Sequence, residues 1–168
     1  MKKTLKTTLA STIIVGALAL PNLIEGSTVE AAQPDSYEVN KSWYEYQGDA
    51  GYDARFVLKE DFIEAVKNNN VKMNGVLLQL DPSKIHLGNN PKIETFTIHD
   101  QVFYKVKNEE HPYMVEFDTK NNLLTKEAVK EAYKDYSIEE GTNSMQITVN
   151  KSQVIFEYKD GIITTVKF

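Results

Sequence analysis

The side chains that most often carry out catalysis are few in this chain and far apart in its sequence. The histidines are His86, His99 and His111, and their spacing matches no metal-binding motif. The sequence contains no nucleophile elbow, no zinc-protease motif, no glycine-rich phosphate loop and no cysteine. We therefore expect no catalytic residue, no metal and no cofactor, and predict that the protein is not an enzyme.

Acidic residues are more numerous, but their spacing favours solvent-exposed loops over a reactive centre. Adjacent pairs at 109–110 and 139–140 do not by themselves place two carboxylates across a glycosidase cleft. Asp49 and Asp53 alternate with Gly48 and Gly51, and the segment lacks the closing glutamate of a twelve-residue calcium loop. This segment is therefore predicted to be a turn.

Aromatic side chains are more informative, because nine tyrosines and one tryptophan exceed what a small core normally needs. Trp43, Tyr44 and Tyr46 occur together, and on a strand the two tyrosines share one face while Trp43 takes the other. Two interpretations follow. Either one face is a stacking platform for bases or sugars, or Trp43 anchors the core and the tyrosines cover its edge.

Two clusters of lysines have the composition of a phosphate-binding surface. Lys126, Lys130 and Lys134 recur every four residues and so line one side of a predicted helix. Acidic residues run beside them at the same spacing: Glu127, Glu131 and Asp135. Such alternation favours a solvent-exposed, salt-bridged face. The second cluster surrounds a tyrosine and has the same two interpretations: Tyr104, Lys105 and Lys107.

The first 31 residues have the composition of a secretory signal peptide. Three lysines precede an apolar run at 9–20, and small residues at Ala31 and Ala32 suit cleavage after either one. The apolar run is shorter than a transmembrane helix requires. Removing three lysines and two glutamates with the leader changes the formal net charge from −5 to −6. This acidity disfavours a chain built as a whole for polyanions.

We expect the exported chain to be released, with any attachment to the cell surface non-covalent. The strand-like segment 162–168 is followed by no hydrophobic tail, and a chain without cysteine cannot carry a cysteine-linked lipid anchor. Residues 32–41 are predicted to be a flexible lead-in, and residues 42–168 a single domain. The oligomeric state is not predicted.

Hydrophobic periodicity then predicts the elements that position these side chains. Helices are expected at 59–67 and 125–136, the second capped by Thr125. A slip in alternation at Asn74-Gly75 suggests a bulge, and 159–161 suggests a hairpin turn. The predicted strands are 43–46, 56–58, 71–80, 93–98, 102–107, 113–117, 145–149, 154–158 and 162–168.

This order of elements indicates an α+β fold. Short connections between strands imply antiparallel pairing, so we predict an antiparallel sheet with two amphipathic helices packed on one face. A helix followed by strands occurs twice, which suggests two helix-plus-strands units.

Several segments are similar to the immunodominant staphylococcal antigen B family of small secreted proteins. The resemblance is carried by YEYQG (44–48), ARFVL (54–58), DFIEAVK (61–67), NVKMNGV (70–76), NNLL (121–124) and KEAVKEAY (126–133). These are core and turn residues, so the resemblance transfers the fold better than an activity, and it implies no particular binding residue.

The resemblance implies an exported, non-enzymatic binding protein of the culture medium and cell surface. Sequence-independent binding of DNA and RNA is attributed to the namesake, which is markedly basic, whereas this chain is acidic. Because phosphate neutralisation supplies most non-specific affinity, we expect weak binding of extracellular nucleic acid at most. The alternative is an inhibitor or modulator of a secreted or host protein, acting through a sheet or helix face.

Overall fold

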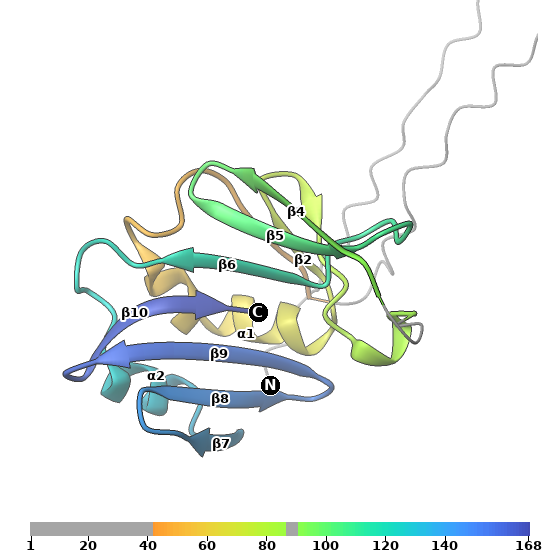
Figure 1. The fold of residues 1–168 in the computed structure, drawn as a ribbon. Coiled ribbons are helices and arrows are strands. Elements are labelled where there is room, and N and C mark those ends of the chain that lie inside the picture. The colour runs from red at the N-terminus through yellow and green to blue at the C-terminus, as the bar shows by residue number, and fades with distance from the viewer. Residues whose placement is uncertain (1–41, 87–90) are drawn as a thin grey trace, which may run out of the picture. The chain divides into compact units, whose positions relative to one another are not determined.

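Most strands of the chain form one antiparallel sheet of seven strands (Figure 1). The computed structural model describes residues 42–86 and 91–168. The predicted leader, the lead-in and part of the loop before residue 91 lie outside the described residues. In spatial order the strands are β4 (Ile93–Ile98), β5 (Gln101–Val106), β6 (Met114–Asp118), β10 (Ile162–Lys167), β9 (Ser152–Lys159), β8 (Ser144–Val149) and β7 (Ser137–Glu140).

Two meanders make up this sheet. β4 to β6 pair in chain order, as do β7 to β10, and the last strand of the second meander pairs with β6. Between the meanders the chain passes through helix α2 (Lys126–Ala132). The predicted α+β class and antiparallel sheet are therefore confirmed, as is the turn between β9 and β10, where Asp160 and Gly161 have φ of 53° and 80°.

A second, small sheet was not predicted. It contains β1 (Tyr44–Tyr46), β2 (Val71–Met73) and β3 (Val76–Leu77), and β1 and β2 are parallel. Parallel neighbours need a crossover connection. Here it consists of the 3₁₀ helix η1 (Ala54–Leu58) and helix α1 (Glu60–Lys67). The short connections between strands correctly predicted the antiparallel pairing of the large sheet, but the long crossover between β1 and β2 was not predicted.

Three other local predictions are wrong. Residues 56–58 are helical, because the Asp53 carboxylate accepts the N–H of Arg55 and starts a turn. The slip at Asn74-Gly75 is the hairpin turn between β2 and β3, with φ of 50° and 81°, and not a bulge. Strand β7 was taken for a loop because it is short and acidic.

The second helix begins as predicted but ends early. The Thr125 hydroxyl accepts the N–H of Ala128, which confirms the N-cap. The helix stops at Ala132, four residues before the predicted end. Its buried stripe consists of Val129 and, at the C-cap, Tyr133.

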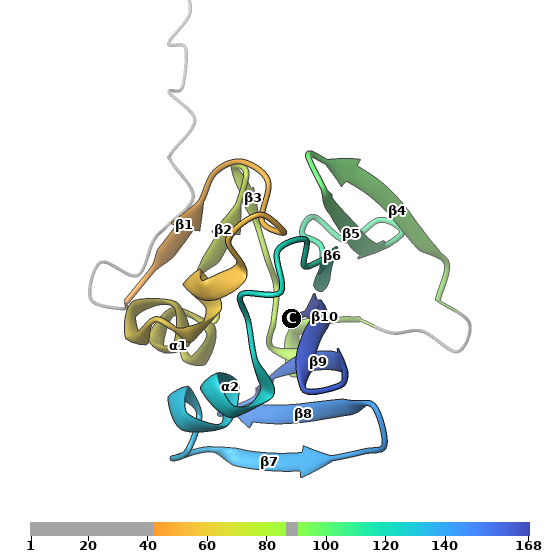
Figure 2. The ribbon, with the colours of Figure 1, turned by 90° about the vertical axis from the view of Figure 1, so that its left-hand side faces the viewer.

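Aromatic contacts connect the helices to the large sheet. The ring of Phe62 in α1 packs edge-on against Phe168 beyond β10, with 5.0 Å between the ring centroids. Tyr133 beyond α2 packs against Phe156 of β9, at 5.8 Å. In Figure 2 both helices lie to the left of these strands. The core is therefore built between the inner face of the sheet and the segments that contain α1, η1 and α2.

Tyr133 also makes a buried hydrogen bond that generates a prediction about stability. Its side chain is fully buried, and its hydroxyl donates to the carbonyl of Val57 in η1, at 2.8 Å. Tyr133→Phe leaves that carbonyl without its donor, so we expect the free energy of unfolding to fall by about 1 to 3 kcal/mol. Urea titration followed by circular dichroism measures the change.

Tyr52→Phe is the matched control, because the Tyr52 side chain is exposed and its hydroxyl stays in water. The control should unfold within about 0.5 kcal/mol of the natural chain. Equal effects of the two substitutions would refute the role assigned to the buried hydroxyl.

Candidate functional site

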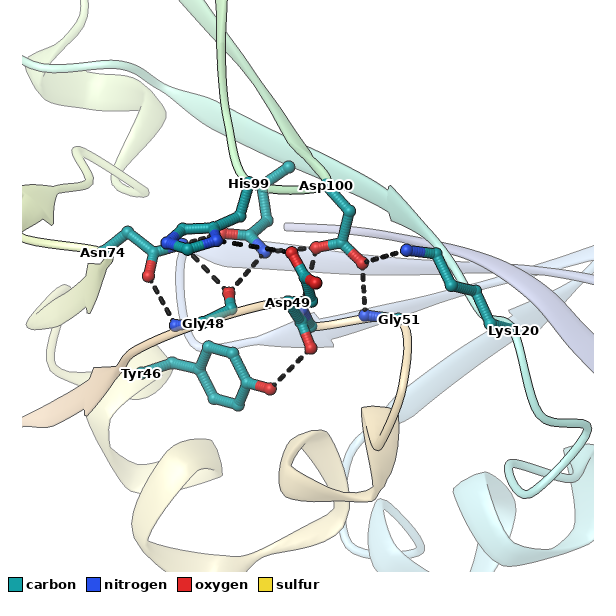
Figure 3. Close-up of polar contacts among 10 residues, drawn as sticks. Tyr46, Gly48, Asp49, Gly51, Asn74, His99, Asp100 and Lys120 are labelled. Atoms are coloured by element: carbon teal, nitrogen blue, oxygen red, sulfur yellow. Dashed lines mark hydrogen bonds and ion pairs between the residues drawn. The ribbon is translucent and has the colours of Figure 1, made fainter.

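The densest polar cluster among the described residues surrounds the turn predicted at 48–53 (Figure 3). Three side chains contact the main chain of this segment: Asn74 from the β2–β3 turn, Asp100 from the β4–β5 turn, and Gln101 at the start of β5. A fourth side chain, Lys120 from the loop after β6, pairs with Asp100. We call this set of four side chains the polar clasp.

Asp100 is the centre of the polar clasp. Its carboxylate accepts the N–H groups of Ala50 and Gly51, at 2.8 and 2.9 Å, as well as the side-chain amide of Gln101. The Lys120 ammonium lies 3.1 Å from Oδ2. Burial by itself would raise the pKa of Asp100, but the donors, led by Gly51 and Lys120, outweigh it and hold the pKa below its ordinary value.

Asn74 and Gln101 complete the clasp around Gly48. Asn74 accepts the Gly48 N–H at 2.6 Å and donates to the Gly48 carbonyl at 3.1 Å. Gln101, which is fully buried, donates to the same carbonyl at 2.9 Å, and the two side-chain amides hydrogen-bond each other. The buried side-chain amide of Gln101 thus has hydrogen-bond partners at both its nitrogen and its oxygen, within the clasp and the loop.

Gly51 is required where the turn meets the large sheet. A Cβ atom at this position would lie 2.1 Å from the carbonyl oxygen of Asp118. The main chains also bond directly, since the Lys120 N–H donates to the Gly51 carbonyl at 2.8 Å. The segment thus fits against β6 only without a side chain, which explains the glycine in the predicted turn.

The geometry of the clasp suits a structural role better than proton transfer. Each Asp100 oxygen already accepts at least two donors, which stabilise the charged form and leave little room for a substrate. His99 lies at the rim, with Nδ1 3.4 Å from the exposed Asp49 carboxylate. Sequence reasoning missed the clasp because each of its members lies 26 or more residues from Gly48 in the chain.

The other two histidines lie elsewhere, near the acidic pair at 109–110. His86 is 3.2 Å from Glu109, and His111 is 3.9 Å from Glu110. Of the three histidines, His111 lines a hollow of about 200 Å³, together with Glu109 and Glu110. Within 42–86 and 91–168, no three histidine or carboxylate side chains gather in a way that would hold a metal ion.

The predicted lysine stripe on α2 is largely neutralised. Lys126 and Lys130 both contact Glu140 of β7, at 2.6 and 2.5 Å, and Lys134 pairs with Glu131 at 2.9 Å. Hydrogen bonds from the two lysines lower the pKa of Glu140 to about 2. Lys126 also lies over the ring of Tyr158, at 4.6 Å. The lysines of this stripe therefore belong to a salt-bridged face, as the alternating charges in the sequence favoured.

The second basic cluster also lies beside acidic residues. The Tyr104 hydroxyl donates to Glu116 at 3.0 Å, on the outer face of the sheet. Lys105 lies opposite Glu94 in the register of β4 and β5, and Lys107 is exposed beyond the end of β5. The two basic clusters thus lie on different elements, the first on α2 beside β7 and the second along β5.

The three aromatic residues at the start of the domain have different surroundings. Tyr44 and Tyr46 are half-buried and stack on Phe56, with 6.0 and 4.3 Å between ring centroids. Burial raises the pKa of Tyr44 to about 12, assisted by the charge of Asp61. Trp43 is 59% exposed. The tyrosines therefore line the core, and Trp43 is the member of the predicted platform whose ring is open to a ligand.

A third group of lysines surrounds a hollow that sequence reasoning did not identify. Lys67 ends α1, Lys84 ends the 3₁₀ helix η2 (Pro82–Lys84), and Lys151 lies between β8 and β9. They border a hollow of about 320 Å³. Two of the three are paired, Lys67 with Glu64 at 3.0 Å and Lys151 with Asp81 at 3.3 Å. Because these lysines are far apart in the chain, no local pattern marks them.

Comparison with known proteins identifies the family. The model of the immunodominant staphylococcal antigen B family matches residues 43–168, so the chain belongs to this family. It is 31% identical to immunodominant staphylococcal antigen B of Staphylococcus aureus strains USA300 and COL, over 84% of this chain and 75% of each relative. No solved structure matches the chain. The described residues form no helix long and apolar enough to span a membrane.

The polar clasp predicts how stability depends on pH. A carboxyl whose pKa is lowered by folding adds stability above its unfolded pKa, about 3.8, and this contribution is lost as the pH falls through the folded pKa. Asp100→Asn removes the charge, so at pH 7 we expect a loss of about 2 kcal/mol. The difference between variant and natural chain should shrink below about pH 4.

Urea titrations at several pH values test this expectation, with Asp135→Asn as the control, because Asp135 is exposed in the turn beyond the end of α2. Both substitutions change the net charge equally. A difference between Asp100→Asn and the natural chain that is constant from pH 7 to pH 3 would contradict the assignment.

Proposed function

We propose that this chain is an exported, non-enzymatic binding protein that acts through its surface in the extracellular space or while non-covalently associated with the cell surface. Membership of a family named for an antigen supports an exposed location. The predicted leader at 1–31 agrees with it. The observation that supports binding over catalysis is the polar clasp, where the most concentrated polar side chains are used to hold a loop.

Extracellular nucleic acid is one candidate ligand, which we expect to bind weakly. Affinity for phosphates comes from lysines that exchange counterions for the nucleic acid. On α2 those lysines are held by Glu140 and Glu131, so a phosphate must compete with a carboxylate already in place. Weak, strongly salt-dependent binding is the expected result.

Glu140→Gln tests this proposal by releasing two lysines at once. Lys126 and Lys130 lose their shared carboxylate, so we expect tighter binding of a single-stranded oligonucleotide at about 50 mM salt. The slope of log affinity against log salt should become steeper by up to about 2. A gel-shift or fluorescence-anisotropy series from about 50 to 200 mM salt measures both quantities.

Glu139→Gln is a matched control, because it changes the net charge equally but Glu139 lies on the opposite face of β7. The control should leave the slope unchanged. No binding by either variant at the lowest salt would reject nucleic acid as a ligand, and equal gains would reject the α2 face.

A protein partner is the second candidate, favoured by the outer face of the large sheet. Phe103, Val115 and Val166 face the core, and the side chains that alternate with them are only partly covered. This outer face mixes apolar and polar groups, as transient interfaces do: Val102, Tyr104, Met114, Glu116, Ile155 and Lys167. An inhibitor or modulator would use such a face, and recovery of a stoichiometric complex that Met114→Lys abolishes would support this role.

A further inference from the structure

The two edges of the large sheet are protected to different degrees. β7 at one edge has four residues and ends in two glutamates, Glu139 and Glu140, and short, charged edges resist pairing with other chains. β4 at the other edge has six residues, IETFTI, with one charge and no proline. From this contrast we propose that β4 pairs with β4 of a second copy of the chain to form a symmetric dimer.

The side chains of β4 are largely exposed, which supports an edge that is available for pairing. The first five residues of the strand are exposed, with Ile93 at 42% and Phe96 at 37%. These two belong to the few large apolar side chains exposed among the described residues, and they lie on opposite faces of one strand. In Figure 2, β4 is the outermost labelled strand beside β5. No described residue forms a ladder with its open side.

The main-chain hydrogen bonds identify which groups are available there. The N–H of Lys107 donates to the carbonyl of Lys92, at 2.8 Å, so these two residues form a hydrogen-bonded pair. Such pairs alternate along an antiparallel ladder. Residues 94, 96 and 98 therefore bond to β5, whereas Ile93, Thr95 and Thr97 direct their N–H and C=O groups to the open edge.

A twofold axis perpendicular to the sheet makes this edge complementary to itself. In an antiparallel pair, residues opposite each other lie on the same face. Centring the axis on Phe96 places Phe96 opposite Phe96 of the second copy, and Thr95 opposite Thr97 of that copy, where the outward groups exchange hydrogen bonds. Phe96 already stacks on Phe103 at 5.0 Å, so the pairing extends an aromatic row across both copies.

The charges agree with the same register. Glu94 lies opposite Ile98 of the second copy, so the two Glu94 carboxylates are kept apart, and each stays beside its own Lys105. Centring the axis on Thr95 instead would make the two Glu94 side chains diagonal neighbours on one face, where like charges repel. The Phe96-centred register is therefore the favoured one.

Such a dimer is closed and weak. Each copy uses its open edge once, so no further copies are added. A single pair of six-residue strands buries less than a standard interface, so we expect dissociation constants in the micromolar range or above. The dimer does not depend on which ligand the protein binds.

Cysteine cross-linking tests the register in a chain that has no cysteine of its own. Phe96→Cys places two thiols at a non-hydrogen-bonded pair, where Cα atoms are about 4.5 Å apart, within the range of a disulfide. We expect mild oxidation to give a covalent dimer, seen as a doubled mass on a non-reducing gel. Glu94→Cys is the matched control and should cross-link at least tenfold more slowly.

Mixing the Glu94→Cys and Ile98→Cys variants should restore cross-linking, because the register places these positions opposite each other. Equal rates for Phe96→Cys and Glu94→Cys alone would indicate random collisions and overturn the proposal.

Sedimentation of the natural chain provides a measurement that needs no substitution. We expect the weight-average mass to rise towards double between about 10 and 500 μM. Thr95→Pro removes an N–H that faces the second copy and not β5, and proline is tolerated on an edge strand in that orientation. This variant should keep the circular dichroism of the natural chain and stay monomeric. If the natural chain stays monomeric over this whole concentration range, the proposed dimer is wrong. The same holds if β4 pairs with a strand of another protein while the natural chain alone stays monomeric.

Discussion

The packing of Phe62 is the interaction on which the rest of this structure depends. Its ring contacts Tyr44 of the small sheet, Phe56 of η1 and Phe168 beyond β10, with 5.0 to 5.5 Å between centroids. One side chain of α1 thus joins both sheets. A chain without cysteine must hold its layers together by burial, and fully burying a side chain of this size contributes about 2 to 3 kcal/mol. Surrounding aromatic rings add geometric specificity.

The polar clasp fixes the segment between β1 and η1, which apolar packing alone does not hold in place. Apolar packing positions α1 and the strands, but the segment between β1 and η1 is rich in glycine and has little to bury. Hydrogen bonds with the side chains of Asp100, Gln101 and Asn74 fix its main chain, and they are strengthened by partial burial. Polar side chains at these turns therefore serve the fold.

Electrostatics restrict the partners that these surfaces suit. The lysines on α2 are held by carboxylates, and the chain as a whole is acidic. A strong polyanion site would need the opposite arrangement. The exposed strand β4 instead presents hydrogen-bonding groups and apolar side chains, which suit pairing with another strand. Family membership therefore identifies the relatives of this protein, whereas its surface chemistry identifies the contacts that are available to it.

The sequence alone was enough to predict the α+β class, the β4–β5 and β9–β10 hairpins, the Thr125 cap and the family, because each is encoded within a short window by periodicity, turn residues or similarity. It also predicted that acids accompany the lysines of α2. Only the tertiary structure decided that Glu140, from a strand taken for a loop, neutralises two of those lysines, that β1 and β2 are parallel, and that Asp100 holds a loop about fifty residues away. These contacts depend on which distant segments the core brings together, and no local pattern carries that information.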